Sequence, residues 1–233
     1  MIAFLQNSWL AILLTVVIAY LLGSISFAII VTKLFSKQDI RDFGSGNAGA
    51  TNVLRSQGKL PALLTTLGDL GKSILSVLIG GWLLTVIQMM PFSGWESYRP
   101  LMYDPDNLEL VGRYLAGFFC IIGHMYPLFF GFRGGKGVMT TLGMTLLLDW
   151  RAALLLLAVF AVIVLCTRMV SLGSIIAAIG LPVATWFFRT YVDHQQWQTV
   201  AFCTVAVSAI SLIVIFKHRS NIVRIFKGTE NKI

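Results

Sequence analysis

Long runs of apolar residues alternate with short polar segments along most of the chain. Five clear runs lie near residues 8–32, 61–89, 114–130, 169–188 and 197–216, and residues 1–32 contain no charged side chain. A helix needs about 20 apolar residues to cross a hydrocarbon core of about 30 Å. The pattern therefore predicts an all-α fold, a polytopic bundle of membrane helices that residues 1–233 form as a single integral membrane domain.

The apolar stretch 138–167 is ambiguous, because an Asp-Trp-Arg tripeptide beginning at Asp149 interrupts it. Two Lys/Arg-rich segments, one after the first run and one at the C-terminus, should both face the cytoplasm by the positive-inside rule. Both do so only if this stretch forms two spans, about 138–148 and 152–167. The first would be only about 17 Å long. We therefore expect about seven spans, one of them short, with the N-terminus outside and the C-terminus cytoplasmic.

Three polar segments would then face the cytoplasm, at about 33–59, 131–137 and 217–233. Only 12% of the residues are charged, against about a quarter in soluble domains. The formal net charge of +8 would suggest nucleic acid on a soluble protein. Here Lys and Arg gather in the cytoplasmic segments, so we expect no nucleic-acid partner. The stretch 90–110 should lie outside, away from these segments.

The first cytoplasmic segment contains FGSGNAGATNVLR, in which Gly44, Gly46 and Gly49 match the dinucleotide fingerprint G-x-G-x-x-G. A dinucleotide fold needs a strand before these glycines, whereas a membrane helix ends about ten residues before them. The chain has no complete Walker A loop either. The fingerprint alone therefore does not indicate a nucleotide-binding fold.

The physical basis of both motifs remains available in this stretch. Glycine lets the backbone adopt positive φ and approach a ligand closely, and successive amide N–H groups form a nest for an anion. Neutral donors and one guanidinium accompany the glycines: Ser45, Asn47, Thr51, Asn52 and Arg55. The segment therefore predicts an anion-binding loop between two membrane helices.

The other two cytoplasmic segments are also cationic. GFRGGKG places Lys136 among glycines, which leave its ammonium group uncrowded. In the C-terminal segment, His218 and Asn221 stand at i and i+3 and would share one face of an amphipathic helix. Because His titrates near neutrality, His218 beside two anion-binding loops is a candidate for chemistry.

Two charged residues stand inside the second apolar run, Asp69 and Lys72, at i and i+3. Each would cost about 2.5–3.5 kcal/mol at the bilayer centre, and pairing between them explains why they are tolerated. We expect them to support a polar cavity on the cytoplasmic side. For His124, in the third run, we expect a structural role, either a hydrogen bond between helices or support of the GFRGGKG loop.

Taken together, the three segments resemble one family, the bacterial membrane glycerol-3-phosphate acyltransferases that use acyl phosphate as donor. The matching motifs are GSGNAGATNVLR, GHMYPLFFGFRGGKGV and HRSNIVRIFKGTE, in this order over nearly the whole chain. The resemblance implies transfer of a fatty acyl group from acyl phosphate to the 1-hydroxyl of sn-glycerol 3-phosphate. The products would be lysophosphatidate and phosphate, in phospholipid biosynthesis. It also implies a multi-pass protein in the lipid bilayer of the bacterial cytoplasmic (inner) membrane, coupled functionally to the enzyme that produces acyl phosphate.

The resemblance assigns roles to individual residues. The residues with expected catalytic roles are Ser45, Lys136, His218 and Asn221. The residues expected to bind substrate are Gly44, Gly46, Asn47, Gly49, Thr51, Asn52, Arg55 and Glu230. Thr51 and Asn52 resemble the site of the donor phosphate, whereas Arg55, together with Lys136 of the catalytic set, would hold the glycerol phosphate. Ser45 would orient the attacking hydroxyl.

The proton of that hydroxyl needs an acceptor, which is either His218 or the donor phosphate itself. The H-x-x-x-x-D dyad of other acyltransferases is absent after all three histidines. The three cysteines show no metal-ligand spacing, so we expect neither a metal nor a cofactor. Three alternatives stay open at this point: a membrane transporter for a small organic anion, an acyltransferase with another donor such as acyl-CoA, and a structural membrane subunit, which would leave the glycine loop unexplained.

Overall fold

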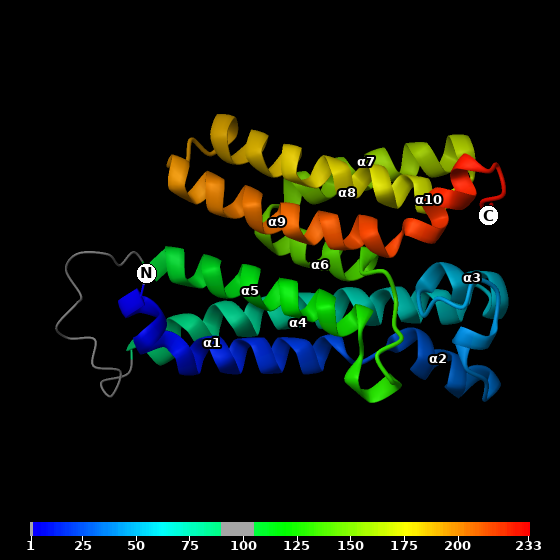
Figure 1. Ribbon diagram of the computed structural model, residues 1–233, viewed down its shortest axis with the longest axis horizontal. Coiled ribbons are helices and arrows are strands. Elements are labelled where there is room, and N and C mark those ends of the chain that lie inside the picture. The colour runs from blue at the N-terminus through cyan, green and yellow to red at the C-terminus, as the bar shows by residue number, and fades with distance from the viewer. Residues whose placement is uncertain (1, 90–104) are drawn as a thin grey trace.

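The computed structural model describes residues 2–89 and 105–233, and every regular element in these two stretches is helical (Figure 1). Six segments are long and apolar enough to cross a membrane, and α6 is a shorter apolar helix. The longer helices are α1 (Ile2–Gly23), α2 (Phe27–Ser36), α4 (Lys59–Met89), α5 (Pro105–Met125), α6 (Val138–Leu148), α7 (Trp150–Thr167), α8 (Val170–Phe187) and α9 (Trp197–Lys217). The short elements are η1 (Ile40–Asp42), α3 (Ala50–Gln57), η4 (Leu128–Phe130), η5 (Phe188–Val192) and α10 (Arg219–Phe226). The expected all-α bundle of about seven apolar segments is confirmed.

Two helix boundaries differ from the predicted ones. α5 begins at Pro105 rather than near residue 114, so the end of the stretch 90–110 is helical. The rest of that stretch, 90–104, was expected to lie outside and falls beyond the described residues. α7 begins at Trp150 rather than at 152, because its N-terminal cap immediately precedes it.

The first apolar run is a single segment by length, but it contains two helices, α1 and α2, separated at residues 24–26. A break of this kind exposes backbone groups that must find partners in a membrane. The hydroxyl of Ser24 donates to the carbonyl of Tyr20 at 2.8 Å and accepts from the amide of Leu128 at 3.2 Å. The ammonium of Lys72 donates to the carbonyl of Ile25 at 2.7 Å. The break is therefore held by contacts from two other helical regions.

Glycines bring α1, α4 and α5 into close contact. A Cβ atom on Gly80 of α4 would lie 2.7 Å from the carbonyl oxygen of Gly112 in α5. A Cβ atom on Gly23 of α1 would lie 2.8 Å from the carbonyl carbon of Cys120, also in α5. Small residues let membrane helices approach until their backbones touch. These three helices therefore form a tightly packed group.

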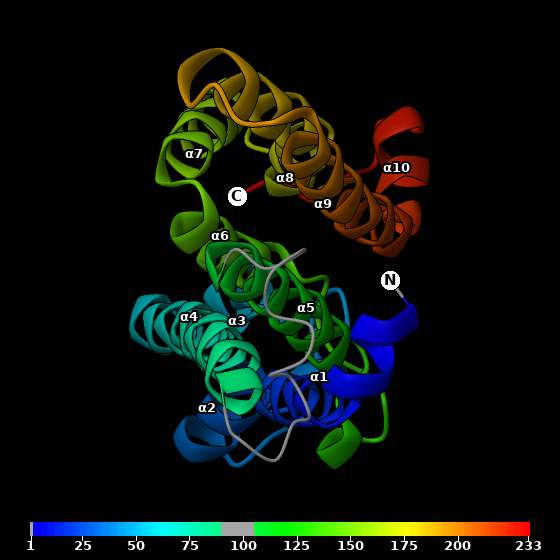
Figure 2. The same ribbon diagram turned by 90° about the vertical axis from the view of Figure 1, so that its left-hand side faces the viewer.

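The helices divide into two groups with α6 between them. Figure 2 shows α1, α2, α4 and α5 on one side and α7, α8 and α9 on the other. One cluster of buried apolar residues crosses this division, with Val77 of α4, Ile121 of α5, Met144 of α6, Leu181 of α8 and Val207 of α9. Met144 is fully buried at the centre of this cluster. The short helix α6 thus joins the two groups.

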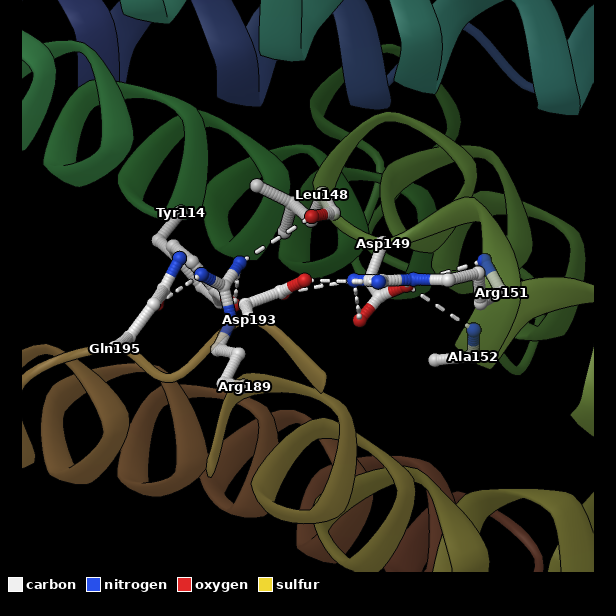
Figure 3. A network of polar contacts seen from close by, with 8 residues as sticks. All are labelled: Tyr114, Leu148, Asp149, Arg151, Ala152, Arg189, Asp193 and Gln195. Atoms are coloured by element: carbon white, nitrogen blue, oxygen red, sulfur yellow. Dashed lines mark hydrogen bonds and ion pairs between the residues drawn. The ribbon is translucent and has the colours of Figure 1, made fainter. Parts of the chain in front are cut away.

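The junction between α6 and α7 is a helix break capped by Asp149 (Figure 3). The Asp149 carboxylate accepts hydrogen bonds from the amides of Arg151 at 3.1 Å and Ala152 at 3.3 Å. The guanidinium of Arg151 lies 3.1 Å from the same carboxylate and 2.7 Å from that of Asp193, which precedes α9. The interruption at Asp149 therefore separates two helices, as the sequence predicted.

The C-terminal end of α6 is capped from another helix by Arg189 in η5. Its guanidinium donates to the carbonyl of Leu148 at 3.2 Å, to Gln195 at 2.8 Å and to the hydroxyl of Tyr114 at 3.5 Å (Figure 3). Arg189 is only 4% exposed. A buried cation thus compensates a carbonyl that the end of α6 leaves without a partner inside the helix.

The polar segments gather at one end of the bundle. Figure 1 shows α3, α10 and the C-terminus together at this end, with the loop that precedes α6 running toward them. The three segments expected to share one face of the membrane, 33–59, 131–137 and 217–233, therefore do lie close together.

Replacing Asp149 tests the cap. Asp149→Ala should lower stability by about 1 kcal/mol, because two amides at the start of α7 lose their acceptor. Asn caps helices about as well as Asp, so Asp149→Asn should keep most of that stability. Thermal unfolding of the two variants in detergent measures the difference. Equal losses in both would show that the cap is not the source of the effect.

Candidate active site

A cavity of about 310 Å³ lies where the three polar segments meet. Its walls come from α3, α4, α6, α7, α8 and α10 as well as from the loops. Most of the residues singled out in the sequence line it: Ser45, Asn47, Gly49, Thr51, Asn52, Arg55, Asp69, Lys136, His218, Asn221 and Glu230. Gly44, Gly46 and Lys72 lie behind this lining. Positions far apart in the chain thus converge on one polar space.

The first glycine loop (residues 43–49) is shaped by two residues with positive φ. Gly44 has a φ of +56° and Gly46 a φ of +68°. Residues that carry a side chain rarely adopt these backbone angles. A Cβ atom on Gly44 would also overlap the side chain of Asn52. Gly49 differs from the expectation, because its backbone is extended at φ −150° and it serves as the N-cap of α3.

Asn52 organises this loop from inside. Its side-chain amide donates to the carbonyls of Ile40 at 3.1 Å and Phe43 at 2.9 Å, and its oxygen accepts from the amide of Ser45 at 3.1 Å. Only 2% of Asn52 is exposed. All of its polar atoms are thus engaged within the protein. Its side chain therefore holds the loop in shape, and the expected contact of Asn52 with a donor phosphate stays a prediction.

An unpredicted residue, Arg41, connects the first glycine loop to the second (residues 131–137). Its guanidinium donates to the carbonyls of Phe130 at 2.6 Å and Arg133 at 3.4 Å and pairs with Asp39 at 2.8 Å. The hydrogen bond from Arg41 lowers the pKa of Asp39. The Asp-x-Arg spacing at the cap of η1 was the only sequence signal for this brace.

The second glycine loop places Lys136 against the C-terminal segment. The ammonium of Lys136 donates to the side-chain oxygen of Asn221. The amide of Asn221 donates to Glu230 at 2.8 Å, and Arg224 donates to the other oxygen of Glu230 at 2.9 Å. Burial opposes ionisation of Glu230, but these hydrogen bonds outweigh it and lower the pKa of its carboxyl. One chain of contacts thus runs from the loop to the C-terminal segment.

The charge on Lys136 is easily lost in this environment. Burial is the largest cause, and the nearby cations Arg224, Arg55 and Lys217 add to it, so that the pKa of Lys136 falls to about 8. Glu230 acts in the opposite direction. Below this pKa the ammonium is present, and an anion in the cavity would hold it charged to higher pH.

His218 is a neutral acceptor at physiological pH. Burial lowers the pKa of its imidazole to about 4, although the contact with the carbonyl of Val214 opposes the shift. That contact, at 2.8 Å, involves Nδ1. Because a carbonyl only accepts, Nδ1 carries the proton and the lone pair lies on Nε2. The residue is 2% exposed and lines the cavity.

Ser45 and Arg55 lie at the accessible side of the cavity. Both are exposed, and Arg55 donates to the carbonyl of Asn231 in the C-terminal segment at 3.1 Å. Thr51 is half-buried in the first turn of α3. These positions leave a hydroxyl and a guanidinium available to a bound anion.

A second, apolar pocket of about 90 Å³ adjoins the polar cavity. It lies between α6, α7 and α8, and both spaces are bordered by Val138, Met139, Phe160 and Ser174. The far part of this pocket is lined by Ala153 and Leu181. The two spaces together suit a molecule with an anionic head and an apolar chain. Among the described residues, no group of three or more His, Cys, Asp or Glu side chains is placed to hold a metal ion.

Comparison with known proteins identifies the family. A family model described as glycerol-3-phosphate acyltransferase matches residues 13–228. The chain belongs to the glycerol-3-phosphate acyltransferase family. The family member from Neisseria meningitidis serogroup B is 41% identical over 218 residues, which cover 94% of this chain and 95% of the relative. The member from Bordetella pertussis is 36% identical, with 94% and 90% covered.

Two crystal structures resemble this acyltransferase in fold. Both are of PlsY, described as an integral membrane glycerol 3-phosphate acyltransferase, one in its glycerol 3-phosphate form and one in its lysophosphatidic acid form. Each is 33% identical to this chain and covers 95% of it, with TM-scores of 0.72 and 0.70. The expectation of a glycerol-3-phosphate acyltransferase is confirmed. The alternative of an organic-anion transporter finds no support.

The lowered pKa of Lys136 gives this acyltransferase a predicted alkaline limit. If the ammonium binds glycerol 3-phosphate, kcat/KM should fall as pH rises through about 8, where Lys136 loses its proton in the free enzyme. Lys136→Arg keeps the positive charge and should show no such fall below about pH 10, whatever its maximal rate. Rates measured against pH for both proteins test this. If kcat/KM of the Arg variant still falls near pH 8, loss of the Lys136 proton is not the cause of the fall.

Proposed function

We propose that this acyltransferase takes its acyl group from acyl phosphate and transfers it to the 1-hydroxyl of sn-glycerol 3-phosphate. The products would be lysophosphatidate and inorganic phosphate. The observation that carries the proposal is the cavity itself, which has space and cationic groups for two phosphates and an adjoining apolar pocket for one chain. An acyl phosphate reacts without a strong acid catalyst, because phosphate is a good leaving group. Positioning and charge stabilisation can then supply much of the rate.

The acceptor phosphate fits the cationic side of the cavity. Lys136 and Arg55 both line it and come from opposite walls, the second glycine loop and α3. In this arrangement Asn221 and Glu230 fix the direction of the Lys136 ammonium. The phosphate would be held from two sides, with the glycerol hydroxyl extending toward the first glycine loop.

The donor phosphate fits the first glycine loop at the start of α3. Free amides at the N-terminus of a helix favour anions, and the hydroxyl of Thr51 is in its first turn. The fatty acyl chain would leave this position through the apolar pocket between α6, α7 and α8. This arrangement places the acyl carbon beside Ser45.

The proton balance of the reaction supports a role for His218 that needs no second carboxylate. The acceptor oxygen forms a bond to the acyl carbon, and the bond from that carbon to the phosphate oxygen breaks. The hydroxyl proton is accepted at Nε2 of His218 and passes to the departing phosphate, which leaves as hydrogen phosphate. Two bound phosphates would raise the pKa of His218 from its low value in the empty cavity and make it a better base.

The distribution of charge also bears on the location of the site in the cell. We place the site on the cytoplasmic side of the bacterial inner membrane, with the N-terminus outside and the C-terminus inside. The clustering of Lys and Arg around the cavity end of the bundle supports this orientation. Acyl phosphate is reactive, so functional coupling to the enzyme that makes it would limit its loss to water.

A donor assay tests the proposal. Purified protein receives radiolabelled glycerol 3-phosphate with acyl phosphate, acyl-CoA or acyl carrier protein in turn. We expect labelled lysophosphatidate with acyl phosphate only. Product formed from acyl-CoA alone would overturn the donor assignment while leaving the acyltransferase assignment intact.

The role of Ser45 has its own test. Ser45→Ala should lower kcat/KM by about a hundredfold, because a misplaced nucleophile loses the benefit of alignment, and thermal unfolding should not change. Ser56→Ala is the matched control: Ser56 is an exposed serine whose hydroxyl donates only to its own helix at Asn52. Wild-type kcat/KM in the Ser45 variant would contradict the assignment.

A further inference from the structure

Two residues that line the cavity, Asp69 and His124, form a buried cluster with Lys72 that the proposed chemistry does not use. The ammonium of Lys72 lies 2.7 Å from the carboxylate of Asp69, 2.7 Å from the carbonyl of Ile25 and 3.0 Å from Nδ1 of His124. The three side chains of the cluster are at most 5% exposed. Lys72 thus donates hydrogen bonds to the break between α1 and α2 and to α5, and it forms an ion pair within α4.

This arrangement decides the state of His124. A lysine ammonium can only donate, so Nδ1 of His124 must offer its lone pair and the imidazole must be neutral. The proton therefore lies on Nε2, at the opposite edge of the ring. The carboxylate of Asp69 lies 3.4 Å from Nδ1 of His124. Its negative charge balances the positive charge of Lys72.

The Nε2 edge of His124 lies against the second glycine loop, which itself lies close to the first. A Cβ atom on Gly135 would overlap Nε2 of His124 and would lie 2.7 Å from the carbonyl of Ala48 in the first loop. The backbone of His124 also accepts from the amide of Gly135 at 3.1 Å, and that of Met125 accepts from Gly134 at 3.3 Å. His124 therefore touches the second loop with its ring and its backbone, immediately before Lys136.

We propose that His124 is a positioning residue: anchored by Lys72 and Asp69, its ring supports the second glycine loop and thereby fixes Lys136 in the cavity. The role of Lys136 rests on the proposed function, but the support of the loop does not. Stability alone is a weak reason for such a cluster, because apolar residues of similar volume usually replace buried ion pairs at no loss. Contact of His124 with the second glycine loop gives the cluster a specific role.

Two substitutions, His124→Asn and His124→Gln, test the two ring nitrogens separately. In His124→Asn the side-chain amide reaches only to the place of Nδ1, so Lys72 keeps a partner while the loop loses its support. In His124→Gln the amide reaches the place of Nε2 and can still touch the loop. We expect Asn to weaken the binding of glycerol 3-phosphate about tenfold or more, since small displacements at a site are costly. We expect the dissociation constant of glycerol 3-phosphate in His124→Gln to stay within about threefold of the wild-type value.

The alkaline limit, the pH above which glycerol 3-phosphate binding is lost, is a second measurement. A loss of stability alone would not change it. Lys136 is faced by Arg55 of α3, by Lys217 and His218 at the end of α9, by Asn221 and Arg224 of α10, and by Glu230. A loosened loop would let water reach Lys136 and raise its pKa from about 8 toward the ordinary lysine value. The pH at which glycerol 3-phosphate binding is lost should therefore rise in His124→Asn.

The experiment measures the dissociation constant of glycerol 3-phosphate against pH for purified wild type and variants in detergent. Because it needs no acyl donor, failure of the donor assignment leaves it valid. Val207→Ala is the control for general destabilisation, as Val207 is 2% exposed in the α9 core, away from the loops. In Val207→Ala we expect no change in the alkaline limit, even if binding weakens. The proposal would be overturned if His124→Asn bound glycerol 3-phosphate as tightly as wild type. It would also be overturned if His124→Asn bound more weakly but kept the alkaline limit of wild type.

A further variant removes the anchor of the ring. Asp69→Asn with Lys72→Met removes both charges together, so that no buried charge is left without its partner; because the carbonyl of Ile25 also loses its donor, thermal unfolding is measured beside binding. It releases Nδ1 of His124 and should weaken binding in the same direction as His124→Asn. Wild-type affinity and an unchanged alkaline limit in this variant would show that the cluster does not anchor the ring.

Discussion

Two buried cations satisfy the backbone where the membrane helices break. Lys72 donates to Ile25 between α1 and α2, and Arg189 donates to Leu148 at the end of α6. In hydrocarbon an unpaired carbonyl costs several kcal/mol, so a helix can end at depth only where the protein supplies a partner. Both cations come from other elements, α4 and η5. The breaks, and the polar cavity that they make room for, therefore depend on contacts between distant parts of the chain.

The cavity itself is defined by an excess of positive charge in a partly buried space. Lys136, Arg55 and Arg224 face it, and the nearby carboxylate of Glu230 is already bound to Asn221 and Arg224. The groups of the protein itself leave this positive charge uncompensated, and burial together with the neighbouring cations lowers the pKa of Lys136. Anionic substrates relieve this cost on binding. The positive charge of the cavity is complementary to the phosphate groups of the proposed substrates.

The sequence was sufficient for features that depend on neighbouring residues. Apolar runs predicted the membrane helices, and the interruption at Asp149 predicted the short helix before it. The spacing of His218 and Asn221 placed both on the buried face of the C-terminal region. The convergence of the three polar segments followed from charge asymmetry.

Features that depend on distant contacts escaped prediction. The brace formed by Arg41 joins residues about 90 positions apart, and no local pattern distinguishes it from an ordinary surface arginine. The commitment of Asn52 to three backbone groups depends on the path of the first glycine loop, so its sequence motif suggested ligand contact instead. For His124 the sequence suggested either a hydrogen bond between helices or support of the GFRGGKG loop, and the structure brings its ring against Gly135 of that loop.

The shortness of α6 has a consequence for the apolar pocket beside it. With eleven residues, at about 1.5 Å each, this helix reaches only about halfway across a membrane before the capped junction at Asp149. Ala153, at the far part of the pocket, is one turn beyond that junction. A hydrocarbon chain that extends from the cavity along α6 would thus approach charged groups instead of more methyl groups. If the proposed acyl chain lies along α6, a chain longer than this helix would have to turn outward into the lipid at the Asp149 junction.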